Sequence, residues 1–397
     1  MNKTNKNKLA GNINKLCLMI FVDRMWFAGP IFVIFLLDRG MNFTQVGLIT
    51  GASYIVSFLL DIPSSIWADR YSRRSLLILS SVAFTLLNIT FFLYDSFWMF
   101  FLGFCFNGIG TAFSSGISSA FLYDTLLSMR KEKRYEKVQA KIVQYSFIGR
   151  IIASAAGVYL YYMDPKLPFL LSAIANFICF WVTFSLVEPT REKSISKSLN
   201  QVKEGLNFLF KHKTIWYIVI IFSAVNAIYD VLFNYYQPVM ELSEIPLAYF
   251  GIIYVFINIF GFLGAGLYAK MKSRFDWKSI MIIYLAVNLI SSLLFGAQIA
   301  ILTVVSIALL TFFAGSYDIY IGSIIHKTVP SSHRATTMSI QGQLYMLLFL
   351  IFMNTVSFSV DRSSMFIGMI INACFALIAL LFFLRINRKE SMNLQLE

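Results

Sequence analysis

Long apolar segments recur along the whole chain, and they constrain its fold more than any other feature. A helix needs about 20 residues to cross the hydrocarbon core of a bilayer. Twelve segments reach this length: residues 16–37, 45–68, 76–93, 97–123, 142–163, 169–187, 214–239, 247–269, 279–296, 300–326, 337–360 and 364–385. A backbone in lipid must satisfy its own hydrogen bonds, and these segments are too long for barrel strands. We therefore expect an all-α integral membrane protein with twelve transmembrane helices.

The composition agrees with lipid as the main solvent of the chain. Of the 397 residues, 58% are hydrophobic and 13% are charged, whereas about 25% of the residues in a soluble domain are charged. The formal net charge is +13, but the basic residues lie in short gaps between the apolar segments. This distribution indicates membrane topology, and we expect no nucleic-acid partner.

The basic residues of the gaps predict the orientation of the chain. Nearly all of the 33 Lys and Arg residues fall in the two tails and in gaps on the same side, whereas Arg39, Lys166 and Arg362 lie in gaps on the other side. Because basic loops stay in the cytoplasm, we expect a multi-pass protein of the cell membrane with both termini cytoplasmic. The first apolar segment contains Asp23-Arg24 and lacks a small-residue cleavage site, so we expect it to be retained as a helix.

The cysteines and histidines are not arranged as metal ligands. They are Cys17, Cys105, Cys179, Cys374, His212, His326 and His333. The cysteines lie singly in apolar segments, and the histidines lack zinc-binding spacing. No glycine-rich nucleotide loop follows a strand pattern, and the gaps are too short for a catalytic domain. We expect no metal, no cofactor, no enzymatic activity and no ATP-driven step.

The longest gap divides the apolar segments into six and six. Within it, Leu199, Val202, Leu206 and Leu209 fall on one helical face, which predicts a short helix on the cytoplasmic membrane surface. The expected domains are a six-helix bundle at 1–187, a cytoplasmic linker at 188–213 and a second six-helix bundle at 214–397.

The two halves also repeat short features. Tyr123-Asp124 near the end of the fourth span recurs as Tyr317-Asp318 in the tenth. Two related six-helix halves are typical of secondary transporters, which bind their substrate between the halves near the membrane midplane.

The gap after the second span carries the charged pattern Asp69-Arg70-x-x-Arg73-Arg74. It resembles the signature loop of the major facilitator superfamily, roughly G-x-x-x-D-R-x-G-R-R, with serines (Ser65 and Ser72) at the two glycine positions. The resemblance extends over nearly the whole chain through the span count, the central gap and the repeated features. It implies two bundles that alternate the access of a central cavity, which is lined by the first, fourth, seventh and tenth helices.

The same resemblance implies a cytoplasmic gate. In the family, the acid of the signature loop lies near the start of the eleventh helix, and an arginine of the loop pairs with an acid at the end of the fourth. Here this implies contacts of Asp69 with the helix that starts near Thr336, and of Arg73 with Asp124. The implied gate residues are Asp69, Arg70, Arg73, Arg74, Asp124 and Arg334. The alternative is that these charges only set the topology.

Charged side chains inside the spans are candidates for function, because each costs on the order of 3 kcal/mol to place in lipid. They are Asp23, Arg24, Asp61, Arg150, Asp230 and Asp318. Asp23 and Arg24 are adjacent, so on a helix they point about 100° apart and cannot form one face. An acid whose access alternates between the two sides can carry a proton, with its pKa raised by burial or lowered by a nearby arginine. We hypothesise that Asp23 or Asp230 carries a coupling proton tuned by Arg24 or Arg150; the alternative for each acid is an interhelix hydrogen bond.

The residues expected at the cavity are polar, aromatic or acidic. They are Asp23, Trp26, Phe27, Asn107, Asn226, Tyr229, Asp230, Asn234, Tyr317, Asp318 and Tyr320. Their rings suit an amphipathic, partly aromatic or cationic molecule, although 17% of the whole chain is aromatic. Phe104 stands where many proton-driven exporters of the family have an arginine in the fourth helix, so coupling and direction stay open.

The leading prediction is a monomeric secondary transporter that exports a small amphipathic drug or metabolite in exchange for protons. The alternatives are proton-coupled uptake of a nutrient and, from a different class, a non-transporting membrane sensor or a lipid flippase. The expected partners are a small-molecule substrate, protons and membrane lipid.

Overall fold

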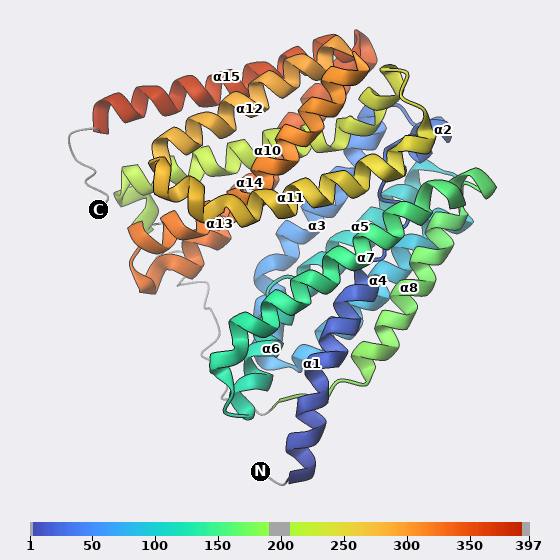
Figure 1. The fold of residues 1–397 in the computed structure, drawn as a ribbon, viewed down its shortest axis with the longest axis vertical. Coiled ribbons are helices and arrows are strands. Elements are labelled where there is room, and N and C mark those ends of the chain that lie inside the picture. The colour runs from blue at the N-terminus through green and yellow to red at the C-terminus, as the bar shows by residue number, and fades with distance from the viewer. Residues whose placement is uncertain (1–2, 190–206, 391–397) are drawn as a thin grey trace. The chain divides into compact units, whose positions relative to one another are not determined.

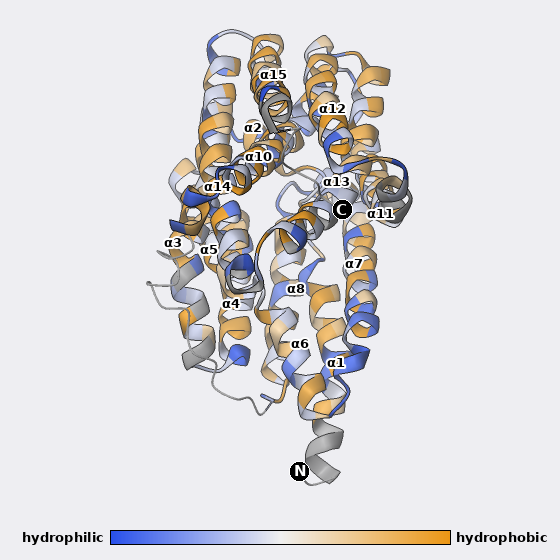
Figure 2. Cartoon of the chain, turned by 90° about the vertical axis from the view of Figure 1, so that its left-hand side faces the viewer, coloured by the Kyte–Doolittle hydropathy of each residue, from blue (hydrophilic) through white to orange (hydrophobic). Residues whose placement is uncertain are grey.

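The computed structural model describes residues 3–189 and 207–390, which form helices joined by short connections (Figure 1). Within those ranges there is no strand. Eleven helices of the described chain are long and apolar enough to span a membrane. Figure 2 shows apolar residues along much of most helices and hydrophilic residues near helix ends, for example at the start of α7. The predicted all-α membrane fold is confirmed.

The chain divides into two compact units, of which unit 1 comprises Met1–Met41, Leu48–Ser198 and Leu247–Val255. Its helices are α1 (Lys3–Asp23), α2 (Phe32–Asp38), most of α3 (Phe43–Arg70), α4 (Arg73–Leu93), α5 (Phe97–Ser114), α6 (Ile117–Ser128), the 3-10 turn η1 (Glu132–Arg134), α7 (Tyr135–Met163), α8 (Leu167–Phe184), the 3-10 turn η2 (Leu247–Tyr249) and the start of α11 (Phe250–Arg274).

Unit 2 comprises Asn42–Gly47, Leu199–Pro246 and Phe256–Glu397. Its helices are α10 (Lys213–Leu242), the rest of α11, α12 (Trp277–Ala297), α13 (Ala300–Thr328), α14 (Ser331–Arg362) and α15 (Met365–Glu390), together with the first turn of α3. The predicted linker and its surface helix fall mainly on residues 190–206, outside the described residues, so the predicted bundle boundaries stay predictions.

The first predicted span is wrong as a single helix. α1 ends at Asp23, residues 24–31 are not helical, and α2 starts at Phe32. Pro30 contributes to the later part of the break, because it has no backbone N–H to donate and disfavours the helical conformation at the residue before it. Short turns hold the segment instead, with the Gly29 N–H donating to the Trp26 carbonyl (3.2 Å) and the Ile31 N–H to the Ala28 carbonyl (3.0 Å). The polar start of α1 and this break are why eleven helices, rather than twelve, have the length and composition of a span.

The fourth predicted span is also interrupted. α5 ends at Ser114, and Gly116 has a φ of 71° before α6 begins at Ile117. A positive φ strains any residue with a Cβ, so glycine accommodates the change of direction.

Direct contact between backbones holds α7 against the chain around the break. A Cβ on Gly149 would lie 2.3 Å from the Phe21 carbonyl oxygen, and a Cβ on Gly157 would lie 2.0 Å from that of Phe27. In lipid, helices associate through close packing rather than the hydrophobic effect, and small residues permit that approach. The same device recurs in unit 2, where a Cβ on Gly264 would lie 1.7 Å from the Phe312 carbonyl oxygen.

Candidate transport site

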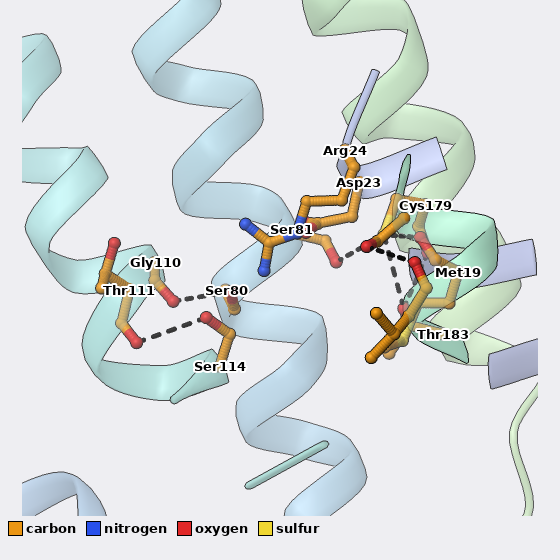
Figure 3. A network of polar contacts seen from close by, with 12 residues as sticks. Met19, Asp23, Arg24, Ser80, Ser81, Gly110, Thr111, Ser114, Cys179 and Thr183 are labelled. Carbon is orange, nitrogen blue, oxygen red and sulfur yellow. Dashed lines mark hydrogen bonds and ion pairs between the residues drawn. The ribbon is translucent and has the colours of Figure 1, made fainter. Parts of the chain in front are cut away.

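The acid of the first span lies at the C-terminal end of α1, in unit 1 (Figure 3). The Arg24 Nε is 3.4 Å from the Asp23 Oδ2, and the side chains are 45% and 15% exposed respectively. The two side chains therefore meet at the end of α1, where the Arg24 N–H still donates to the Ile20 carbonyl at 3.0 Å.

A second arginine belongs to the same electrostatic environment. Arg24 and Arg150 both interact electrostatically with the Asp23 carboxylate. Arg150, on α7, lies with its guanidinium 5.9 Å from the centre of the Phe147 ring. The structure thus brings together three of the four residues that we predicted for proton coupling.

A buried cysteine network lies beside Asp23 (Figure 3). The Cys179 Sγ, on α8, lies 3.4 Å from the Ser81 Oγ of α4 and 3.7 Å from the Met19 carbonyl oxygen of α1. The Thr183 hydroxyl donates to the Cys179 carbonyl at 2.7 Å. These contacts join three helices around the acid, which gives Cys179 a packing role, whereas Cys374 is exposed.

The non-helical segment after Asp23 is anchored to several helices of unit 1. The Phe27 N–H donates to the Ser172 hydroxyl at 3.0 Å, and the Phe27 side chain is buried. The Trp26 ring lies 5.6 Å from the Phe32 ring. A Cβ on Gly29 would lie 3.3 Å from the Tyr254 hydroxyl, so Tyr254 lies against the break. Nothing in the sequence pattern predicted this tyrosine.

Asn107 connects α3 and α5 within unit 1. Its Oδ1 accepts from the Ser53 hydroxyl at 3.0 Å and from the Thr111 hydroxyl at 3.3 Å. A role of Asn107 in substrate binding stays a prediction.

The acid of the seventh span lies on α10, in unit 2. The Tyr345 hydroxyl of α14 donates to the Asp230 Oδ2, and the Asn234 side chain donates to the Asp230 carbonyl at 2.8 Å. Asp230 is half-buried. The sequence predicted Asp230 and Asn234 but missed Tyr345, because a partner on another helix leaves no spacing signal.

The aromatic residues predicted for the cavity differ in their surroundings. Tyr317 and Tyr320 are 4% and 5% exposed and belong to the core of unit 2, where the Tyr317 hydroxyl donates to the Phe222 carbonyl at 2.9 Å. The Tyr229 ring lies 5.9 Å from that of Phe233. Asn226 is half-buried on α10, and the Asp318 side chain lies outside the described part of the structure.

The structure contains the ion pair that the signature loop implied. The Arg73 Nη1 is 2.5 Å from the Asp124 Oδ2, with side chains 15% and 13% exposed. The Arg74 guanidinium donates to the Phe184 carbonyl. In unit 2, the Arg334 Nε donates to the Val329 carbonyl at 2.9 Å, just past the end of α13. The Asp69 and Arg70 side chains lie outside the described part of the structure, so their contacts stay predictions.

Glu188 is a residue of this region that the sequence did not single out. Its carboxylate accepts from the Ser72 hydroxyl (2.7 Å) and from the backbone N–H groups of Arg73 (3.0 Å) and Arg74 (3.0 Å). It therefore satisfies the first amide groups of α4, where the helix dipole also favours a negative charge.

Glu188→Gln is expected to lower the stability of the protein by about 1 kcal/mol, because the amide keeps one acceptor oxygen but loses the charge. Thermal unfolding of the purified protein checks this, with Glu132→Gln as a control because Glu132 is exposed in the turn η1. Equal melting temperatures for Glu188→Gln and the wild type would contradict the assigned role.

Asp361 plays the same part at another helix start, within unit 2. Its two carboxylate oxygens accept from the backbone N–H groups of Phe43 (2.8 Å) and Thr44 (2.6 Å), in the first turn of α3. The Phe43 ring stacks 5.6 Å from that of Tyr235. This turn belongs to unit 2, whereas the rest of α3 belongs to unit 1.

No group of three His, Cys, Asp or Glu residues in the described chain could hold a metal ion.

The chain is similar to known transporters over most of its length. Residues 16–353 match the family model described as Major Facilitator Superfamily. An uncharacterised MFS-type transporter of Bacillus subtilis, YxaM, is 25% identical over 388 residues, which cover 93% of this chain and 94% of that protein. The class D tetracycline resistance protein of Salmonella ordonez is 25% identical over 169 residues, which cover 41% of this chain and 40% of that protein. A crystal structure of a variant of the nucleoside transporter NupG has a TM-score of 0.80 at 16% identity, and the match covers 94% of this chain and 99% of that chain. The chain therefore belongs to the major facilitator superfamily, as a multi-pass secondary transporter of a small molecule.

Proposed function

We propose that this transporter exports a small amphipathic compound in exchange for protons. The observation that carries the proposal is the presence of a carboxylate inside a predicted span of each unit, both with a polar partner. Asp23 lies beside Arg24 in unit 1, and Asp230 accepts from Tyr345 in unit 2. Acids kept at membrane depth with a named partner are typical of proton relays.

The mechanism follows from the effect of charge on these contacts. Protonation of Asp230 removes the negative charge that strengthens its hydrogen bond from Tyr345. Because Tyr345 is on α14 and Asp230 is on α10, this weakens a link between two helices of unit 2. A proton that changes helix contacts favours one conformation over another, which is the requirement for coupling.

Export is favoured over uptake by one comparison. A protein named for resistance to tetracycline matches about two fifths of this chain, which supports export of a drug over uptake of a nutrient. The proposed cavity residues are Asp23, Trp26, Phe27, Asn107, Asn226, Tyr229, Asp230, Asn234, Tyr317, Asp318 and Tyr320.

The gate proposal extends this mechanism to the signature loop. We infer that Asp69, Arg70 and Arg334 act with the Arg73–Asp124 pair in closing the side that the basic loops predict to be cytoplasmic. The Arg73–Asp124 ion pair and the hydrogen bonds of Glu188 hold the start of α4 in place. This supports the proposal, because the signature loop then acts from a fixed helix end.

The pH dependence of ligand binding tests the function directly. A thermal-shift screen of amphipathic compounds is run on the purified protein at two pH values. In an exchanger, proton and substrate bind alternately, so the ligand is expected to stabilise the protein more at the higher pH. In a symporter they bind together, and the larger shift comes at the lower pH.

Flux in proteoliposomes then separates the remaining alternatives. Ligands from the screen are expected to move against their gradient when a pH gradient is imposed. Larger ligand shifts at low pH, followed by flux in the direction of the protons, would replace export with uptake. Ligand binding without any flux would indicate a sensor.

A further inference from the structure

We propose that the turn between α6 and α7 is a binding surface for the head groups of anionic phospholipids. Six basic residues define this surface, which we name the basic rim: Arg130, Lys131, Lys133, Arg134, Lys137 and Lys141. All six are exposed, and only Glu132 and Glu136 oppose them in the same stretch. Clusters of four to eight basic residues next to a membrane span attract anionic lipid, and the attraction falls off within a Debye length.

Most of the charge of the basic rim is not used inside the protein, although the Lys141 Nζ lies 5.6 Å from the centre of the Tyr145 ring. Within the described residues, ion pairs form at Arg24, Arg39, Arg73 and Lys166, which lie outside the rim. Two other cations of unit 1 differ from the rim, because Lys15 donates to the Ser185 carbonyl at 2.5 Å and Arg74 donates to that of Phe184. Those two cations complete helix ends, whereas the rim presents its charge outward.

The rim is held in a defined shape rather than on a loose loop. Val138 and Ile142 are buried in the core of unit 1 on one side of the turn, and Leu126 and Met129 on the other. The Lys131 N–H donates to the Leu126 carbonyl at 2.8 Å. Binding a lipid therefore requires little further ordering of the backbone, which favours affinity.

Exposed apolar and aromatic residues place the rim at the edge of the lipid-facing surface. Leu127 on α6 and Val143 on α7 are 49% and 42% exposed. Tyr123 is 46% exposed, and its ring meets that of Tyr135 edge to face at 5.8 Å. Tyrosine is enriched where hydrocarbon gives way to head groups. The basic rim lies between Leu127 and Val143 in the chain, so a bilayer that covers these apolar residues would bring its phosphates to the rim.

The backbone conformation of Arg130 also supports lipid binding by the rim. Its φ is 59°, in the left-handed region that favours glycine, and its N–H closes the end of α6 on the Leu127 carbonyl at 2.9 Å. Glycine is the usual residue at this position after a helix, because it has no Cβ. A cation occupies a position where the backbone favours glycine, which is consistent with a use for its charge.

Native mass spectrometry of the purified protein tests the proposal, with phosphatidylglycerol and phosphatidylethanolamine as probes. Each Lys or Arg beside an anionic surface contributes about fivefold in affinity. The wild type is expected to prefer phosphatidylglycerol by about tenfold or more, and the preference should vanish in about 1 M salt, where the Debye length is about 3 Å. The variant K131Q/K133Q/R134Q/K137Q is expected to bind both lipids within about twofold.

Three further variants keep the test independent of folding and of net charge. K211Q/K213Q/R274Q/K278Q removes the same number of charges from unit 2 and should keep the preference. Arg130→Gly should lower it about fivefold without lowering the melting temperature. Replacing both acids of the stretch, as E132Q/E136Q, should raise it.

Four results would overturn the proposal. They are an unchanged preference in the rim variant, an equal loss in the unit 2 variant, an unchanged preference in the glycine variant, and displacement of phosphatidylglycerol by millimolar inorganic phosphate. The last result would assign the rim to free phosphate instead of lipid.

Discussion

Asp230→Asn is expected to lower gradient-driven transport in proteoliposomes strongly while leaving the protein folded. The amide cannot take up or release a proton, yet it retains an oxygen that can accept from the Tyr345 hydroxyl. Because asparagine resembles the protonated acid, movement of the substrate down its own gradient should continue. We expect the ratio of gradient-driven to downhill flux to fall by about tenfold to 100-fold. This factor corresponds to the free energy of one hydrogen bond to a charged group, which the variant no longer has in the coupling step.

Tyr345→Phe and Glu244→Gln serve as the matched variants for this test. Tyr345→Phe removes the donor and leaves the acid, so it should change the pH dependence of transport and keep coupling. Glu244 is exposed just beyond the end of α10, and its replacement should change neither flux. If Asp230→Asn keeps full gradient-driven transport, Asp230 does not carry the proton, and Asp23→Asn becomes the variant to measure.

Gly157→Ala is expected to destabilise the protein strongly or to prevent its folding. The added Cβ would lie 2.0 Å from the Phe27 carbonyl oxygen, well inside the contact distance of the two atoms. The obstacle is backbone, so no side chain can rotate to relieve it, and α7 must move away from the break between α1 and α2. Overpacking of this kind costs about 1–3 kcal/mol, and more when backbones collide. Fluorescence-detected gel filtration after heating measures the loss.

Gly11→Ala is the control, because a Cβ at Gly11 on α1 would meet nothing within 4 Å. That change should leave stability equal or slightly higher, since alanine favours helix over glycine by about 1 kcal/mol. Gly264→Ala should repeat the effect in unit 2, where the Cβ would lie 1.7 Å from the Phe312 carbonyl oxygen. Normal folding of Gly157→Ala would show that α7 is not held at this distance.

The helical fold was predictable because lipid imposes a simple rule on sequence. Every span must be apolar and must satisfy its own backbone, so length and hydropathy identify most helices, such as α12 (Trp277–Ala297) against the predicted 279–296. The two interrupted spans were missed for a reason that is also physical. Hydropathy does not register backbone geometry, and Pro30 and Gly116 are single residues inside otherwise apolar segments.

The candidate site was only half predictable. Intramembrane acids stand out in the sequence, since their cost in lipid makes them rare, and Asp23 and Asp230 were identified in this way. Their surroundings were not, because Tyr345, which donates to Asp230, and Tyr254, which lies against the break after α1, are ordinary aromatic residues in a chain rich in them. Arg73 and Asp124 were paired in advance only through the family resemblance.

The sequence by itself determined that this protein lies in a membrane, that it is helical, which family it belongs to and which acids lie in its membrane segments. Each of these follows from composition and local pattern. The tertiary structure decided which groups those acids meet. Arg24 meets Asp23 at the end of α1, Tyr345 reaches Asp230 from another helix, and Glu188 completes the start of α4 from 115 positions beyond Arg73. Such contacts depend on distances in space that no spacing along the chain encodes.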